Sequence, residues 1–136
     1  MRIQEALEVC RANHHSVLVT RKRDGSPQPS PVLHGVNEQG HLVISSREPA
    51  YKVRNLRRDP RATLCVIPDG FFGRWVSVEG QASIVSLPQA MDALVELYRS
   101  IAGEHEDWAD YRAAMERERR VIIAIEPLRA GPDHAG

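Results

Sequence analysis

The stretch SVLVTRKRDGSPQPSPVLHGV, residues 16–36, predicts an antiparallel hairpin and places its second strand at a sheet edge. β-Branched residues dominate the first half, and the Asp-Gly pair at 24–25 is a strong signal for a tight turn. In the second half Pro27, Pro29 and Pro31 alternate, so every missing backbone N–H falls on one side of the extended chain. Such a strand can pair along one edge only. We therefore expect it at the edge of a sheet or at the lip of a cavity.

Hydrophobic periodicity predicts the remaining elements. The expected strands are residues 16–21, 26–36, 41–46, 62–67, 75–85 and 120–127, and the expected helices are residues 5–11, 49–59, 86–103 and 108–118. This order is neither a regular βαβ alternation nor a sandwich pattern. We predict a mainly β fold with helices (α+β), a small six-stranded antiparallel barrel, formed by residues 1–136 as a single domain.

Several local features make this prediction specific. Pro49 suits the first turn of the basic helix, and Ser86 with Gln89 forms a capping-box pattern for the next one. Gly80 marks a bulge or bend in its strand. Residues 62–67 are apolar almost throughout, which predicts burial on both faces. We expect residues 127–136 to be loose.

Composition excludes several functional classes. The 136 residues carry a formal net charge of zero and no apolar run long enough to cross a bilayer, so we expect neither a nucleic-acid partner nor a membrane partner. The N-terminus does not resemble a signal peptide, which predicts a cytoplasmic location. Cys10 and Cys65 are the only cysteines, and the six histidines are scattered, so we expect no metal site. No motif of a self-sufficient hydrolase is present, and an enzyme of this sequence would rely on a bound cofactor.

One short segment, residues 46–62, concentrates positive charge in this neutral chain. It holds six cations and only two acids, the cations being Arg47, Lys52, Arg54, Arg57, Arg58 and Arg61. One interpretation is a solvated helix whose arginines pair with nearby acids. The alternative is an anion site, because the segment begins after two serines, Ser45 and Ser46, whose hydroxyl and backbone groups can help to hold an anion. We favour the anion site.

Three segments carry a resemblance to a known family: VISSREPAYKVRNLRRDPRATL at 43–64, WVSVEG at 75–80 and LYRSIAGEHEDWADYR at 97–112. Together with the Asp-Gly hairpin, they resemble the pyridoxamine 5′-phosphate oxidase-like superfamily of FMN-binding split-barrel type. The likeness is greatest to its actinobacterial branch of deazaflavin (coenzyme F420)-dependent oxidoreductases. The pattern E-P-x-x-K-x-R-N-L-x-x-D-P-R-A at 48–62 is the most specific part. It implies a homodimer with a cofactor groove between two split barrels.

The resemblance also implies roles for individual residues. Lys52 matches the position that contacts the cofactor phosphate, and Arg54 and Asn55 follow it in the motif. The implied cofactor-binding residues are Gln28, Ser30, Ser45, Ser46, Lys52, Arg54, Asn55 and Trp75, with no catalytic side chain and no metal ligand. Gln28 and Ser30 would line the ring. Trp75 would be a groove wall or dimer contact, although a plain core or interface tryptophan is an equally good interpretation.

The implied activity is that of an F420-dependent reductase, which transfers a hydride from the reduced deazaflavin to a small conjugated substrate. Two alternatives stay open at this point. One is an FMN-dependent oxidoreductase on the same fold, and the other is a non-enzymatic protein that carries or stores F420. The sequence lacks the C-terminal arginine and histidine motif of true pyridoxamine-phosphate oxidases, so we do not expect vitamin B6 oxidation.

Overall fold

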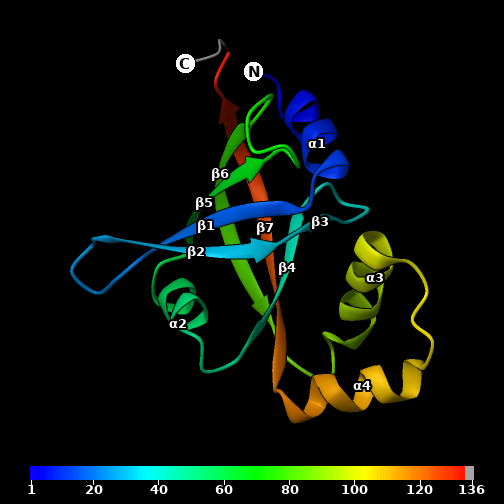
Figure 1. Ribbon diagram of the computed structural model, residues 1–136. Coiled ribbons are helices and arrows are strands. Elements are labelled where there is room, and N and C mark those ends of the chain that lie inside the picture. The colour runs from blue at the N-terminus through cyan, green and yellow to red at the C-terminus, as the bar shows by residue number, and fades with distance from the viewer. Residues whose placement is uncertain (134–136) are drawn as a thin grey trace.

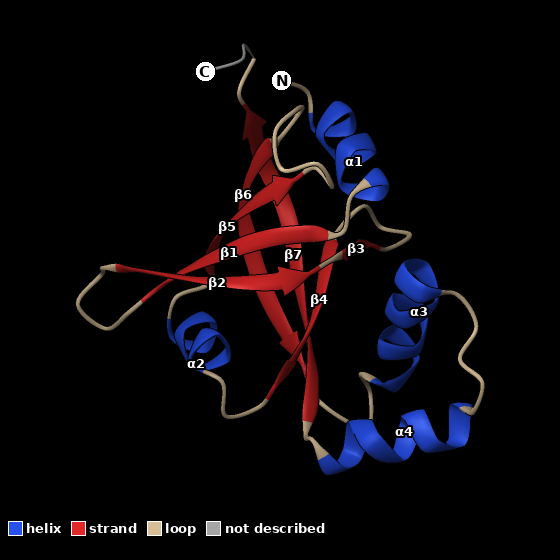
Figure 2. Ribbon diagram, viewed as in Figure 1, coloured by secondary structure: helices blue, strands red, loops and turns tan. Residues whose placement is uncertain are grey.

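A computed structural model describes residues 1–133 and shows a strongly curled antiparallel sheet with helices around it (Figure 1, Figure 2). The strands follow the order β2-β1-β5-β6-β7-β4-β3 across the sheet. Their bounds are β1 (His15–Arg21), β2 (Pro27–Leu33), β3 (Gly35–Val36), β4 (Leu42–Arg47), β5 (Arg61–Ile67), β6 (Val76–Val85) and β7 (Arg120–Gly131). The helices are α1 (Ile3–Ala12), α2 (Tyr51–Arg58), α3 (Met91–Ala102) and α4 (Trp108–Arg117). The predicted α+β antiparallel barrel is confirmed, with seven strands in place of six.

The extra strand arises because the expected strand 26–36 breaks at His34. Before the break, β2 pairs with β1 at one edge of the sheet, and after it β3 pairs with β4 at the other edge. His34 is fully buried at this crossing, where its Nδ1 lies 2.8 Å from Ser16 Oγ and its Nε2 lies 3.0 Å from the Cys10 carbonyl oxygen. These hydrogen bonds to β1 and α1 fix the His34 side chain at the point where the chain passes from one edge of the sheet to the other. Strand periodicity in the sequence cannot reveal such long-range contacts.

The proline-spaced strand β2 lies at the edge of the sheet, as predicted. Its register opposes Pro31 to Val17 and Pro29 to Val19 of β1. The hairpin turn is closed by Gly25 in the left-handed region (φ 85°), while Asp24 Oδ1 accepts hydrogen bonds from the backbone and hydroxyl of residue 26.

Two apolar clusters lie on different parts of the sheet. The larger one fills the curled sheet beneath α1 and α2 and includes Leu18, Val53, Leu64 and Ile123. The smaller one joins α3 and α4 to β4 and β7 through residues such as Leu94 and Met115. The helices α3 and α4 therefore stand beside one edge of the barrel rather than within its core (Figure 2). No helix within residues 1–133 combines the length and the apolar character needed to span a bilayer.

Four local predictions are corrected or refined by the structure. Pro49 precedes the basic helix, which begins after Ala50. Ser86 caps no helix, because α3 starts only at Met91 and the Ser86 side chain bonds elsewhere. Along β5 buried residues alternate with half-buried ones, so only one of its faces is fully covered. Residues 127–131 are not loose, since they extend β7 alongside β6; residues 134–136 lie outside the described chain.

The predicted irregularity at Gly80 is confirmed as a register shift between β6 and β7. A Cβ atom built on Gly80 would lie 2.1 Å from the carbonyl oxygen of Glu126. The neighbouring backbone therefore leaves no space for a side chain at this position.

A candidate cofactor-binding cleft

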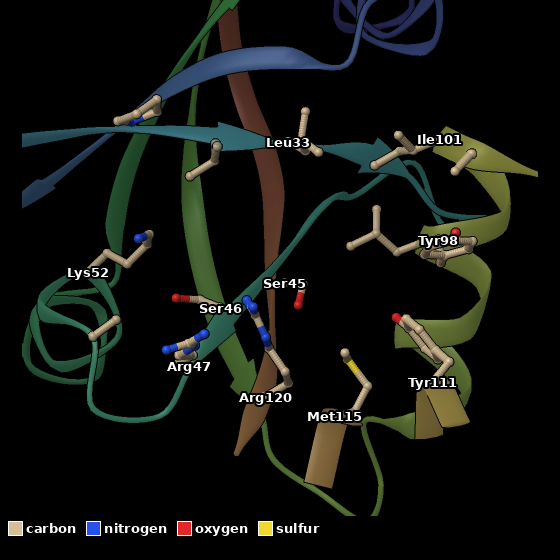
Figure 3. Close-up of a pocket in the computed structure, with 15 residues that line it drawn as sticks. Leu33, Ser45, Ser46, Arg47, Lys52, Tyr98, Ile101, Tyr111, Met115 and Arg120 are labelled. Atoms are coloured by element: carbon tan, nitrogen blue, oxygen red, sulfur yellow. The ribbon is translucent and has the colours of Figure 1, made fainter. Parts of the chain in front are cut away.

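A cleft of about 660 Å³ opens between the sheet edge and three helices. Figure 3 shows β2 above it, α2 on one side, β4 below it, and α3 with α4 on the other side. The lining residues are Pro31, Val32, Leu33, Ser45, Ser46, Arg47, Ala50, Lys52, Leu97, Tyr98, Ile101, Ala102, Tyr111, Met115 and Arg120. The volume falls within the range typical of small-molecule and cofactor sites.

Polar groups gather at the end of the cleft where β4 leads into α2. The turn between these elements is closed by a hydrogen bond from Ala50 N–H to the Arg47 carbonyl oxygen, which brings the first turn of α2 back beside the strand end. Lys52 thereby faces the cleft beside Ser45 and Ser46 of β4. Arg120 completes this end, because it begins β7 directly opposite Arg47 in the β4-β7 register. The polar end therefore presents three cations and two hydroxyl groups.

The charges of this polar end are only partly balanced by the protein. Glu118 Oε1 lies 3.3 Å from Arg47 Nη2 and 2.7 Å from Arg120 Nη2, so one carboxylate forms ion pairs with both guanidinium groups. Lys52 meets no acid and no hydrogen-bond partner anywhere in residues 1–133. Partial burial, together with the nearby charge of Arg120, lowers the pKa of Lys52. An anion bound here would offset the burial of the Lys52 charge and its repulsion by Arg120.

The opposite end of the cleft is apolar and aromatic. Tyr98 and Tyr111 stand together there, with ring centroids 5.1 Å apart, and Ile101 and Met115 complete the wall. The Tyr111 hydroxyl donates a hydrogen bond of 2.8 Å to the Leu94 carbonyl oxygen, which fixes the position of that ring. A wall of this kind suits a flat, largely apolar ring system.

A second depression, of about 590 Å³, lies on the other side of α2 beside the β1-β2 hairpin. It is lined by Lys22, Arg23, Asp24, Gln28, Tyr51, Arg54, Asn55 and Arg58. Arg54 is exposed there and forms no ion pair with any described residue. Asn55 is buried, and its Nδ2 donates to Thr20 Oγ1 at 3.1 Å and to Gln28 Oε1 at 3.3 Å. The amides of Gln28 and Asn55 thus tie α2 to the hairpin.

The structure distributes the predicted site residues over several places. Ser45, Ser46 and Lys52 share the cleft, whereas Gln28, Arg54 and Asn55 share the depression. Ser30 lies on β2 and lines neither hollow, and its buried hydroxyl oxygen meets no partner within the described chain. Trp75 is apart from both: it is 41% exposed and lines a small hollow with Met1 and Arg74. Within one chain Trp75 is not a wall of the cleft.

Other cations of the basic segment interact with the protein itself. Arg57 lies 2.7 Å from Glu48, Arg61 lies 2.7 Å from Asp59, and Arg58 donates to the Arg21 carbonyl oxygen at 2.8 Å. The interpretation as a helix whose arginines pair within the protein therefore describes these three cations, and the anion site stays a prediction for the others. Lys52 and Arg54 form no ion pair with any residue from 1 to 133.

Sequence reasoning missed several cleft residues. Arg120 looks like an ordinary charged strand residue, and Tyr98, Tyr111 and Met115 look like the apolar stripes of amphipathic helices. Only the pairing of β4 with β7 and the packing of α3 and α4 bring them to the cleft. Among residues 1–133, no three His, Cys, Asp or Glu side chains are close enough to hold a metal ion.

Comparisons with known proteins agree with the observed fold. The family model described as pyridoxamine 5′-phosphate oxidase matches residues 3–131. The solved structure of the conserved hypothetical protein Rv2991 from Mycobacterium tuberculosis has a TM-score of 0.78 and 26% identity, over 96% of this chain and 82% of that one. A structure described as an F420 reductase has a TM-score of 0.71 and 22% identity, over 91% and 94%. A putative pyridoxamine 5′-phosphate oxidase from Listeria innocua has a TM-score of 0.67 and 17% identity, over 95% of both chains.

Proposed function

Because the chain belongs to the pyridoxamine 5′-phosphate oxidase family, we propose that it is an F420-dependent reductase acting on a small conjugated substrate. One observation carries the proposal: a single cleft joins a cationic end at Arg47, Lys52 and Arg120 to an aromatic, apolar end. Family membership supports a flavin or deazaflavin oxidoreductase. The choice of F420 rests on the distribution of charge around α2.

The residues present fit such a cofactor. F420 combines a planar ring, a phosphodiester and a tail of glutamates, so it needs an apolar slot followed by a long cationic track. The cleft provides the slot and a phosphate site at Lys52. The second depression, with Lys22, Arg23 and Arg54, extends the positive charge past α2 and suits the acidic tail. FMN has a single phosphate and would leave this second depression unused.

The chain itself would contribute position and electrostatics. The bound deazaflavin supplies the hydride, and no side chain need act as a nucleophile. Lys52 and Arg120 would hold the phosphate, while Ser45 and Ser46 would orient the adjoining part of the cofactor. The aromatic wall of α3 and α4 would exclude water and align a conjugated substrate with the ring.

A homodimer is part of the proposal. The outer face of β5 leaves Thr63, Cys65 and Ile67 half-buried, and exposed Leu33 lies at the same end of the sheet. Accessible apolar groups such as Leu33 and Ile67 on an outer sheet face favour contact with a second chain. The mass of a single chain is 15.3 kDa. Size-exclusion chromatography with light scattering should give twice this mass at micromolar concentration. A monomeric mass would contradict this part of the proposal.

Two alternatives are separated from the main proposal by one titration. Purified protein is mixed in parallel with F420 and with FMN, and binding is followed by fluorescence at several salt concentrations. We expect tighter binding of F420, weakened by added salt because exposed charges hold the tail. FMN that binds tightly and stays bound during purification would favour the FMN-dependent enzyme. Binding of F420 without turnover of quinones, nitroaromatics, tetrapyrroles or unsaturated lactones would favour the carrier.

A further inference from the structure

The backbone of β2 presents an unusual free edge to the cleft. The backbone hydrogen bonds that flank the strand fix its orientation. The His34 N–H donates to the His14 carbonyl oxygen, and the Ser26 carbonyl oxygen accepts from the Lys22 N–H. The backbone hydrogen-bonding groups of residues 26 and 34 therefore face β1. Because backbone groups alternate in an antiparallel ladder, the carbonyls of the prolines at 27, 29 and 31 point to the other, unpaired edge.

This free edge offers acceptors but almost no donors. Each proline lacks an N–H, so the first backbone donor of the edge is that of Leu33, after Pro31. Pro31 and Leu33 both line the cleft, and β4 faces them from the other side without pairing to β2. The side-chain donors of the cleft lie away from β2, at Ser45 of β4, Lys52 of α2 and Arg120 of β7. The two walls thus have opposite hydrogen-bonding character.

We infer that Pro31 is a specificity-determining residue that selects a deazaflavin over a flavin, an inference that rests on the proposed function. In both ring systems the phosphate-bearing chain leaves from N10, and position 5 lies on the opposite edge of the central ring. If the phosphate lies at Lys52 and Arg120 and the ring spans the cleft, position 5 would face the wall formed by β2. There it would meet the carbonyl oxygen of Pro31, and the Leu33 N–H would donate to the neighbouring carbonyl oxygen at position 4, which both ring systems possess.

The chemistry of position 5 then decides the preference. In an oxidised flavin it is N5, whose lone pair needs a donor and is repelled by a carbonyl oxygen. A buried acceptor without a donor is unfavourable. In a deazaflavin it is C5–H, which has no lone pair and makes a weak, favourable contact with a carbonyl oxygen. A single missing N–H at residue 31 therefore distinguishes the two cofactors.

The first test compares FMN with 5-deaza-FMN on the wild-type protein, because these ligands share the chain and phosphate and differ only at position 5. We expect 5-deaza-FMN to bind at least about tenfold more tightly, the effect of one unsatisfied buried acceptor. Equal affinities would overturn the inference. Because neither probe has a glutamate tail, this result is independent of whether F420 is the natural cofactor.

The second test restores the missing donor. Pro31→Ala should raise the affinity for FMN about tenfold and leave that for 5-deaza-FMN within about twofold. Pro27→Ala is the matched control, since it adds an N–H to the same edge outside the cleft, and it should change neither affinity. An unchanged FMN affinity in a folded Pro31→Ala protein would overturn the inference, whereas failure of wild type to bind F420 would overturn the proposed function. If Pro31→Ala does not fold, the wild-type ligand pair still decides.

Discussion

The interior around His34 and the cleft beside Lys52 are both places where the protein removes polar groups from water, but it treats them differently. At His34 both ring nitrogens have hydrogen-bond partners, and the His34 carbonyl oxygen lies 3.0 Å from His14 Nδ1. Lys52 in the cleft has no acid or hydrogen-bond partner within residues 1–133, and neither does the buried hydroxyl of Ser30 on the neighbouring strand β2. Satisfied buried polar groups stabilise a fold, whereas unsatisfied ones store free energy that a ligand can release. The difference separates residues that hold this protein together from residues that serve its function.

Removal of the His34 side chain should produce the largest effect. His34→Ala leaves the Ser16 hydroxyl and the Cys10 carbonyl unpaired and opens a cavity between α1 and the sheet. We expect a loss of about 4 kcal/mol in the free energy of unfolding, measured by urea denaturation. Cofactor affinity measured well below the urea transition should stay unchanged. A loss below about 1 kcal/mol would show that the His34 interactions contribute little to stability.

The same residue should make stability depend on pH. Burial lowers the His34 pKa to about 4 from the ordinary value of 6.5. Between these values the unfolded chain binds a proton that the folded protein does not, so the stability contribution is complete above pH 6.5 and is lost as pH falls towards 4. The resulting decrease in the free energy of unfolding should approach about 3 kcal/mol. Urea denaturation across this range checks it, with His34→Gln as the control that lacks the titrating ring. Parallel pH curves for the two proteins would exclude His34 as the source.

A smaller effect is expected from Lys52→Ala, and it should fall on binding rather than on folding. Loss of a charge-assisted contact to phosphate should weaken F420 binding at least about tenfold in a fluorescence titration. Stability should hold or rise slightly, because the substitution removes a partly buried cation near Arg120. Unchanged affinity would remove Lys52 from the site. A large loss of stability would show that Lys52 belongs with His34 among the structural residues.

The smallest effect is expected from Arg57→Ala, which removes a cation of the same helix whose charge is already paired with Glu48. The pair is solvent-accessible, so we expect a loss of about 0.5 kcal/mol or less in unfolding free energy. F420 affinity should change less than twofold at physiological salt. Equal loss of affinity in Arg57→Ala and Lys52→Ala would mean that the helix acts only through its total charge.

Much of the fold could be predicted because the relevant signals are local. The Asp-Gly hairpin, the alternating prolines and the glycine at residue 80 each act through the backbone conformation or hydrogen bonding of a few neighbours. The break of the strand at His34 could not be predicted, because it depends on a carbonyl group of α1 that is far away in the sequence. The capping pattern at Ser86 also misled, since the Ser86 hydroxyl instead accepts from Arg57 and donates to Glu48.

The candidate site divides in the same way. From the sequence alone, one could predict which segment is cationic and that Lys52 lies on a helix following a serine-ended strand. Only the tertiary structure decided the environment of each cation, because Arg57 pairs with Glu48 across a turn, whereas Arg47 and Arg120 share the single carboxylate of Glu118. It also brought Arg120 and the tyrosines of α3 and α4 to one cleft. Helix and turn formation depend on neighbours in the chain, whereas the environment of a charge depends on every group that packing brings within a few ångströms.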